Sequence, residues 1–309
     1  MTARHDAGRR RGVYEMAAAM TISGTIGWFV LKSGATPGQV VFWRCLFGGA
    51  VLAATCAVQG IRPWALTRRE AILSLGSGVA IVANWLLLFG AFPKVGIAVA
   101  TIVYNTQPFL LVFLGRVFLG ERLSIAMVGW LGMAFVGLLL IVWMGLIKGN
   151  AGDHYVLGTL MALGAALCWA AAAVQTKLLS GTPPQTIALV HTMVGIVLLA
   201  PTGLSHTGAV SASGWAMLAT IGVVHTGLVY ILMYDAIHRL PTSLQGALSY
   251  LYPAVAVLVD IVAFDRIMTP IEAAGMAAIL CAATGVTGIQ GELWQRAIRR
   301  WGGHGRLGQ

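Results

Sequence analysis

The stretch that decides the fold is residues 96–116, which read GIAVATIVYNTQPFLLVFLGR. Only its last residue is charged, and its 21 residues match the length that an α-helix needs to cross the hydrocarbon core of a bilayer. Its apolar residues run continuously and do not alternate with polar ones, which favours a helix over a β-barrel strand. Pro108 lacks an amide hydrogen, so the carbonyl of Tyr104 loses its helical partner and the span should bend there.

Nine more stretches of similar length and composition flank this one. Together they predict ten membrane spans, at residues 13–31, 38–58, 70–91, 96–116, 124–145, 156–178, 184–203, 214–235, 242–263 and 270–290. The connections are short and rich in Gly and Pro, so no folded soluble domain fits between spans. Only 10% of the 309 residues are charged, whereas a soluble domain carries about 25%. We therefore expect an all-α integral membrane protein.

The basic residues are unevenly distributed among the connections. With ten spans both termini lie on one side, and the segments on that side hold 15 of the 20 Lys and Arg residues, against 4 on the other side. Cytoplasmic segments are enriched in Lys and Arg, so we expect a multi-pass protein of the cell (inner) membrane with both termini cytoplasmic. The net charge of +10 then reflects orientation and contact with anionic membrane lipid, and it predicts no nucleic-acid partner.

The proline-containing segment occurs again in the second half of the chain. Residues 104–108 read YNTQP, residues 249–253 read SYLYP, and other matching positions lie 145–147 residues apart. Because each half holds five spans, the second half enters the membrane upside down, an arrangement that recurs in secondary carriers working by alternating access. We expect ten transmembrane helices as two inverted five-helix repeats, with a first repeat at 1–147 (basic tail 1–12), a linker at 148–154, a second repeat at 155–290 and a basic cytoplasmic tail at 291–309.

These features also resemble a known family. The GERLS segment at 120–124 followed by Gly129 and Gly137, the mid-span prolines and the five-plus-five layout resemble the drug/metabolite transporter superfamily in its EamA-type ten-helix group. Within that group the chain looks most like the YddG-type aromatic amino acid exporters. The resemblance implies export of amino acids, especially aromatic and other largely apolar ones. Two departures are Phe264-Asp265-Arg266, where the family often has Gly-Glu-Arg, and His191, where Arg is typical and where the polar group becomes titratable.

Polar and aromatic residues inside the spans are the candidates for a central cavity. A charge in mid-bilayer costs about 2.5–3.5 kcal/mol on insertion scales, so Arg44 should face protein or water. It either balances a substrate carboxylate or is tied to a carbonyl or acid at a helix end, while the mid-span histidines either line the cavity or form interhelical hydrogen bonds. The prolines either expose carbonyls to a ligand ammonium group or simply kink their helices. The full candidate set for substrate binding is Trp28, Arg44, Asn84, Trp85, Tyr104, Asn105, Gln107, Pro108, Trp169, His191, His225, Tyr250, Tyr252 and Pro253.

Other functions are less well supported by the residues. The sequence has no HExxH, no paired mid-membrane acids, no nucleophile motif and no Gly-rich phosphate loop, so we expect no enzyme activity. The four cysteines lie in spans without CxxC spacing, and we expect no metal site and no cofactor. The alternatives are an exporter of another metabolite or drug in the same superfamily, or a membrane-embedded enzyme. The expected partners are a small-molecule substrate and lipid, and the sequence does not determine the oligomeric state.

Overall fold

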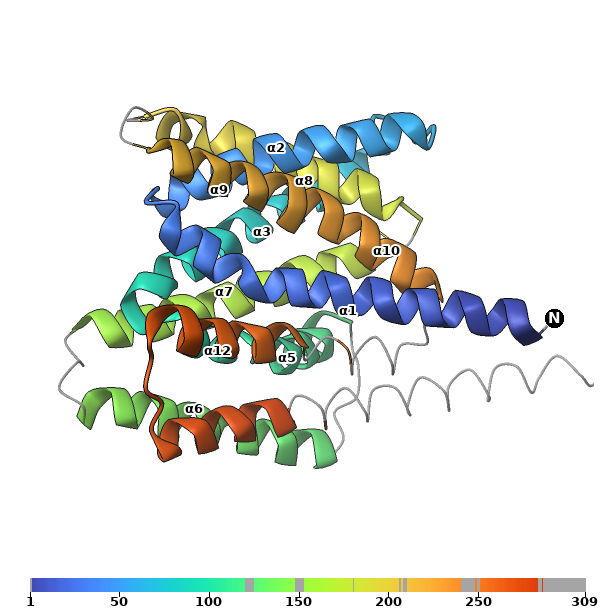
Figure 1. The fold of residues 1–309 in the computed structure, drawn as a ribbon. Helices are drawn as coiled ribbons and strands as arrows, with labels where there is room; N and C mark the ends of the chain where they lie inside the picture. Colours follow the sequence, from blue (N-terminus) through green and yellow to red (C-terminus); the bar gives the residue numbers. More distant parts are fainter. Residues whose placement is uncertain are drawn as a thin grey trace, which may run out of the picture.

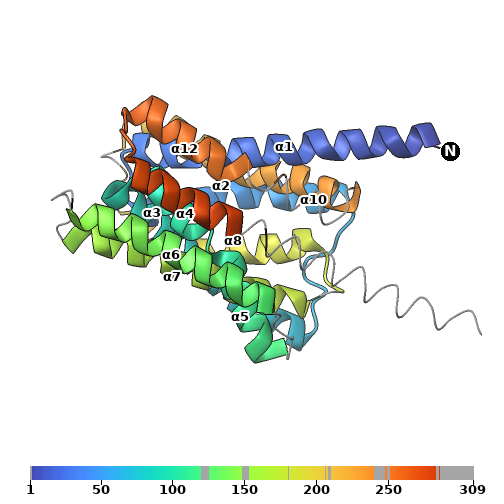
Figure 2. The same cartoon turned by 90° about the horizontal axis from the view of Figure 1, so that it is seen from below.

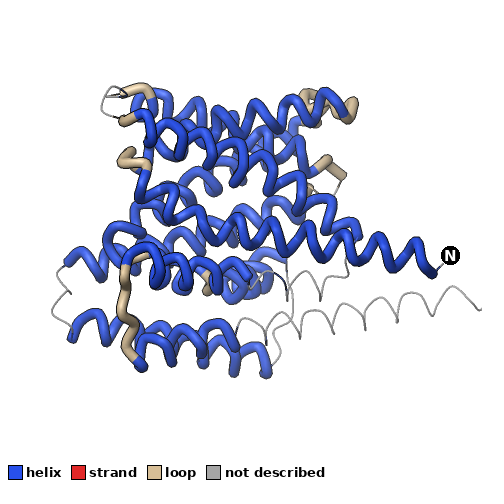
Figure 3. The backbone as a smooth tube through the Cα atoms, viewed as in Figure 1, coloured by secondary structure: helices blue, strands red, loops and turns tan. Residues whose placement is uncertain are grey.

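The structure is a computed structural model that describes residues 2–119, 125–147, 153–179, 181–205, 207, 210–239, 248, 251–282 and 285. This part of the chain consists of helices and short connections, without a β-strand (Figure 3). The helices are α1 (Thr2–Lys32), α2 (Pro37–Val58), α3 (Arg68–Val95), α4 (Ile97–Tyr104), α5 (Gln107–Leu119), α6 (Ile125–Ile147), α7 (Asp153–Lys177), α8 (Pro184–Gly203), α9 (Ala212–Gly222), the π-helix η2 (Val223–Leu228), α10 (Val229–Arg239) and α12 (Leu251–Phe264).

The lengths and compositions of these helices fit a membrane protein. Among the described residues, six helical stretches are long and apolar enough to cross a bilayer, and Leu251–Phe264 and Pro270–Ala282 are shorter apolar helices. Helix α1 begins at Thr2, well before the start predicted at residue 13, and it projects beyond the other helices toward the N-terminus (Figure 1). The predicted all-α membrane fold is confirmed, while the domain boundaries and the linker stay predictions. Residues 148–152 and the tail 291–309 lie outside the described residues.

The predicted bend in the fourth span is confirmed as a complete break. Helix α4 ends at Tyr104 and α5 begins at Gln107, just before Pro108. The turn is held by Asn105, whose side-chain Nδ2 donates to the carbonyl of Thr101 at 2.7 Å. Proline removes one helical hydrogen bond, and the asparagine side chain satisfies a carbonyl near the break. The span is therefore interrupted where the sequence is most polar.

The two halves pack as an inverted pair. Helix α1, which opens the first half, starts at the N-terminal end of the bundle, and α7, which opens the second half, starts at the opposite end (Figure 1). The major contacts come in exchanged pairs: α3 packs on α7 as α10 packs on α1, and α4 and α5 pack on α7 as α12 packs on α1 (Figure 1 and Figure 2). Helix α2 packs on its own counterpart α8. This exchange is what a two-fold axis between inverted repeats produces, so the centre of the bundle is built from both halves.

A largely buried ion cluster lies at the end of the bundle away from the N-terminus. Arg266 donates to the carbonyl of Val95 at 2.6 Å and to Asp260 at 3.2 Å, and it lies 3.6 Å from a carboxylate oxygen of Glu272. Asp260 also accepts from the amide of Ala98 at 2.9 Å, at the start of α4. Both acids are almost fully buried. The cluster thus joins the connection between α3 and α4 to the connection between α12 and the helix Pro270–Ala282.

Candidate functional site

Arg44 is a buried cation in the middle of α2. It is 7% exposed, and none of the described residues supplies a carboxylate in an ion pair with it. Its Nε donates to the Thr226 hydroxyl of η2 at 2.8 Å. Its guanidinium carbon lies 4.3 Å from the ring centroid of Trp85 and 5.6 Å from that of Phe89, both on α3. Arg44 was predicted either to balance a substrate carboxylate or to be tied to a carbonyl or acid at a helix end. Among the described residues, no tie to an acid is observed.

Three tyrosines lie near this guanidinium. Tyr104 at the end of α4, Tyr230 on α10 and Tyr252 on α12 all lie within electrostatic range of it. Asn84 supports this wall, because its side chain contacts the Tyr104 hydroxyl and donates to the carbonyl of Ala165 on α7 at 2.8 Å. Both halves of the chain thus contribute to an aromatic, hydroxyl-bearing shell around one positive charge.

His225 links this shell to α1. Its Nε2 lies 3.0 Å from the Thr25 hydroxyl, and its Nδ1 lies 3.4 Å from the carbonyl of Thr220. The ring packs edge-on against Phe29, with centroids 4.8 Å apart, and it lies within electrostatic range of Arg44. The interhelical hydrogen bond that was one of its two predicted roles is therefore present.

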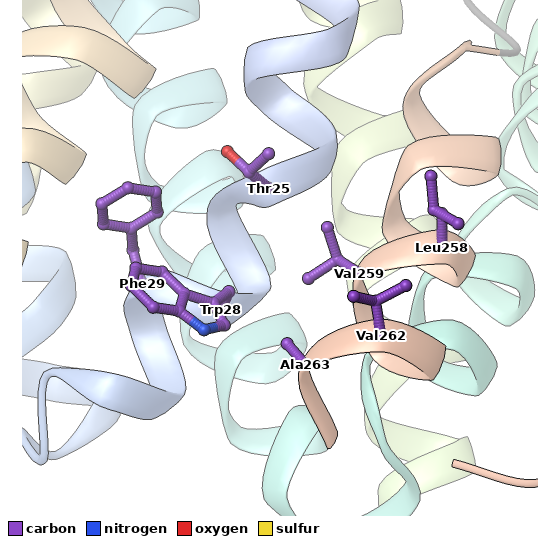
Figure 4. A pocket seen from close by; sticks show the side chains of 7 residues that line it. All are labelled: Thr25, Trp28, Phe29, Leu258, Val259, Val262 and Ala263. Atoms are coloured by element: carbon purple, nitrogen blue, oxygen red, sulfur yellow. The ribbon is translucent and has the colours of Figure 1, made fainter. Parts of the chain in front are cut away.

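A pocket of about 350 Å³ opens between α1 and α12 (Figure 4). Its lining side chains are apolar apart from one hydroxyl and one indole nitrogen, and they belong to Thr25, Trp28, Phe29, Leu258, Val259, Val262 and Ala263. Leu258 and Val262 are exposed, so the pocket opens on the outer surface of the bundle. Thr25 and Phe29 each contact His225 as well. Trp28 therefore lies on the wall of this side pocket, with His225 between the pocket and the arginine.

The remaining predicted residues are spread over other helices. His191 on α8 is buried and lies 2.9 Å from the Ser77 hydroxyl of α3, an interhelical hydrogen bond like that of His225. Gln107 is half-buried, and its Oε1 has no hydrogen-bond partner among the described residues. Trp169 on α7 is half-buried and packs on the core.

The prolines and their neighbours complete the set. Pro253 is buried in the first turn of α12, and Asn105 is buried at the break described above. The backbone of Pro108 lies in α5, but its side chain is outside the described residues, as is the whole of Tyr250. The structure thus brings Asn84, Trp85, Tyr104, His225 and Tyr252 into the neighbourhood of Arg44, while His191 bonds to Ser77, Trp169 packs on the core and Trp28 lines the side pocket.

Sequence reasoning missed three residues that contact or face Arg44. Thr226 and Phe89 are an ordinary threonine and phenylalanine within apolar spans, and nothing local distinguishes them. Tyr230 carried a signal, because it lies 145 residues after Trp85 and so occupies the matching position of the second repeat. The two-fold exchange of contacts brings such matching positions together at the centre.

Known proteins resemble this chain in sequence and in fold. The model of the EamA-like transporter family matches residues 10–143 and 156–288. The chain is 30% identical over 258 residues to the uncharacterized transporter YxxF of Bacillus subtilis (strain 168), covering 81% of each. It is 26% identical over 238 residues to the threonine/homoserine exporter RhtA of Escherichia coli (strain K12), covering 73% of this chain and 75% of that one. A solved crystal structure at 22% identity superposes with a TM-score of 0.65 over 91% of this chain and 98% of the other, a likeness in fold alone.

Proposed function

Because the chain belongs to the EamA-like transporter family, and is thus a multi-pass membrane transporter and not an enzyme, we propose that it exports amino acids by alternating access. The single observation that carries the substrate class is the buried charge of Arg44, which forms no ion pair with any acid in the described part of the chain. The export of amino acids by the relative RhtA supports the same class.

The energetics of Arg44 favour a role in ligand binding. Removing an ion from water costs several kcal/mol in real proteins, and a buried ion without an opposite charge recovers little of that cost. The hydrogen bond to Thr226 uses Nε alone, and the Trp85 ring covers one face of the guanidinium. A carboxylate can then bind the Nη groups in the plane of the guanidinium, which is the geometry that arginine offers to planar anions. The substrate carboxylate would supply the missing charge.

The location of the site fits alternating access. The shell around Arg44 includes Trp85 and Tyr104 from the first repeat and Thr226, Tyr230 and Tyr252 from the second. When two inverted repeats rock against each other, a site built from both is opened first to one side and then to the other. We place both termini in the cytoplasm of an inner-membrane protein, on the distribution of basic residues described above, so that export runs away from the N-terminal end.

Two substrate ranges within the amino acids have specific support. The aromatic walls supplied by Trp85 and three tyrosines favour aromatic and other largely apolar side chains, which gain from stacking and burial. The relative RhtA exports threonine and homoserine, which favours small hydroxylated side chains as the second candidate. The scarcity of basic residues near Arg44 disfavours phosphate-bearing substrates, which bind where several cations converge.

The test is transport by the purified protein in liposomes. Vesicles preloaded with one unlabelled amino acid are given labelled amino acids outside, and counterflow is followed for phenylalanine, leucine, threonine and homoserine. Preference for phenylalanine and leucine supports the first range, and preference for threonine and homoserine supports the second. Flux of another metabolite or drug without any amino acid flux would refute the proposal. Repeating the uptake with an imposed pH gradient tells whether protons are coupled to transport.

A further inference from the structure

The eighth span contains a local departure from α-helical geometry that its counterpart lacks. Helix α9 ends at Gly222, the six residues of η2 form a π-helix, and α10 continues from Val229. The matching span of the first repeat, α3, is one continuous α-helix from Arg68 to Val95. Single π-helical turns inside α-helices cost stability and are frequent at functional sites. The asymmetry between the repeats therefore points to a role that only the second half performs.

The wide turn places Thr226 against Arg44. The Thr226 hydroxyl donates to the carbonyl of Ile221, five residues earlier, at 3.2 Å, which is the π-helical spacing. Its only proton is used in that bond, so its lone pairs face the other way and accept from the Arg44 Nε at 2.8 Å. Thr226 itself is fully buried. The hydroxyl is thus held in one orientation, as an acceptor for the arginine.

Close packing of α2 on η2 fixes this contact further. A Cβ on Gly48 would lie 2.6 Å from the Thr226 methyl group, and a Cβ on Gly222 would collide with Phe47. A Cβ on Gly227 would lie 2.6 Å from Val51. Small residues at helix crossings allow backbones to approach closely in membranes. These glycines let the π turn sit directly on the segment of α2 that carries Arg44.

The corresponding contact of α3, in the first repeat, is arranged differently. His191 corresponds to Arg44, and its partner Ser77 directly precedes Gly78, whose Cβ position borders His191. In the second repeat the partner of the arginine comes four residues after Gly222, the glycine whose Cβ position borders Arg44. The hydroxyl that meets the guanidinium therefore lies at a different position along its helix from the one that meets His191, and it lies within the π-helical turn.

We infer that Thr226 is a positioning residue, which holds Nε of Arg44 so that the two Nη groups are presented to the substrate carboxylate. The inference rests on the proposed amino acid transport. With Nε bonded to Thr226 and one face covered by Trp85, the guanidinium has lost most of its freedom to rotate before substrate arrives. Such pre-organisation improves affinity by reducing the ordering that binding requires.

The test compares three variants in the liposome assay. Thr226→Val keeps the shape and removes the hydroxyl, Thr226→Ser keeps the hydroxyl, and Thr192→Val is the matched control. Thr192 is also a buried threonine facing a glycine of α2, but its hydroxyl donates only to the carbonyl of Leu189 in its own helix. We expect Thr226→Val to raise KM about 10-fold, since a hydrogen bond to a charged group is lost, with little change in kcat. Thr226→Ser should stay within about 3-fold of the wild type, as should Thr192→Val.

A second readout separates positioning from general damage. The carboxamide analogue of the substrate lacks the negative charge, so its inhibition constant as a competitor should be nearly the same in Thr226→Val and in the wild type. Equal weakening of the amino acid and its amide, or an unchanged KM, would overturn the inference while leaving amino acid transport intact. If Thr226→Val does not fold, Thr226→Ala replaces it, and failure of both to fold would show a purely structural hydroxyl. Absence of amino acid flux in the wild type would refute the proposed function and this inference together.

Discussion

Replacing Arg44 by methionine should strongly reduce amino acid transport without destabilising the fold. Methionine has a similar length and keeps the apolar stem, so the packing of α2 is preserved. The change removes one charged hydrogen bond to Thr226, about 1.5–3 kcal/mol, and a cation–π contact with Trp85, about 2 kcal/mol when desolvated. It also removes a desolvation penalty of several kcal/mol. These contributions roughly cancel, so the free energy of unfolding should stay within about 1 kcal/mol of the wild type or rise.

Arg266→Met is the matched control, because Arg266 is also a cation surrounded by protein. In contrast to Arg44, it is bonded to Asp260, to the carbonyl of Val95 and, through an ion pair, to Glu272. Removing one partner of a buried ion pair costs about 3–5 kcal/mol, because the opposite charges stay buried without it. At about 2–4 °C per kcal/mol, the melting temperature should fall by roughly 6–20 °C.

The assays are thermal unfolding in detergent, followed by tryptophan fluorescence, and uptake into liposomes. For Arg44→Met we expect kcat/KM for the best amino acid to fall at least about 10- to 100-fold, the loss of one charge-assisted contact with the carboxylate. If Arg44→Met melts as low as Arg266→Met, the arginine is a structural element and the reasoning is wrong. Transport with an unchanged KM would refute it equally.

Three further outcomes follow from the packing. Gly48→Leu should abolish stable expression, because a Cβ at this position would lie 2.6 Å from the Thr226 methyl group. Gly34→Ala lies in an open loop and, despite the positive φ, should be tolerated at a cost of about 1 kcal/mol. Expression levels and size-exclusion profiles of the two variants test this. Asn84→Leu removes the bond between α3 and α7 and should lower the free energy of unfolding by about 0.6–1.7 kcal/mol, and an unchanged melting curve would contradict the assignment. Alanine at both Gln107 and Trp169 should reduce transport if these residues line the substrate route, and unaltered flux would remove them from the site.

Much of the candidate site could be predicted from the sequence, because the cost of placing a polar residue in a membrane span depends on that residue and its span. A charge such as Arg44 within an apolar span must face protein or water whatever its neighbours are. Pro108 must break the helical hydrogen bonding wherever the span lies, and the structure divides α4 from α5 there. Tyr230 could have been predicted as a site residue, because it occupies the position in the second repeat that matches Trp85. Trp28 shows the limit of this reasoning, since an aromatic residue in a span can face the core or line a pocket on the outer surface of the bundle.

The sequence by itself determined the class of protein, the ten spans and the inverted repeat, because hydropathy, charge distribution and a repeated pattern are properties of the chain alone. Only the tertiary structure decided which residues meet Arg44. Its hydrogen bond to Thr226 joins positions 182 residues apart and depends on a π turn that no local sequence signal marks. The stretch at 96–116 likewise predicted a bend, but the placement of Tyr104 within electrostatic range of a cation on α2 follows from how the helices pack. Contacts between helices depend on close packing of the whole bundle, and that is where the site of this protein is formed.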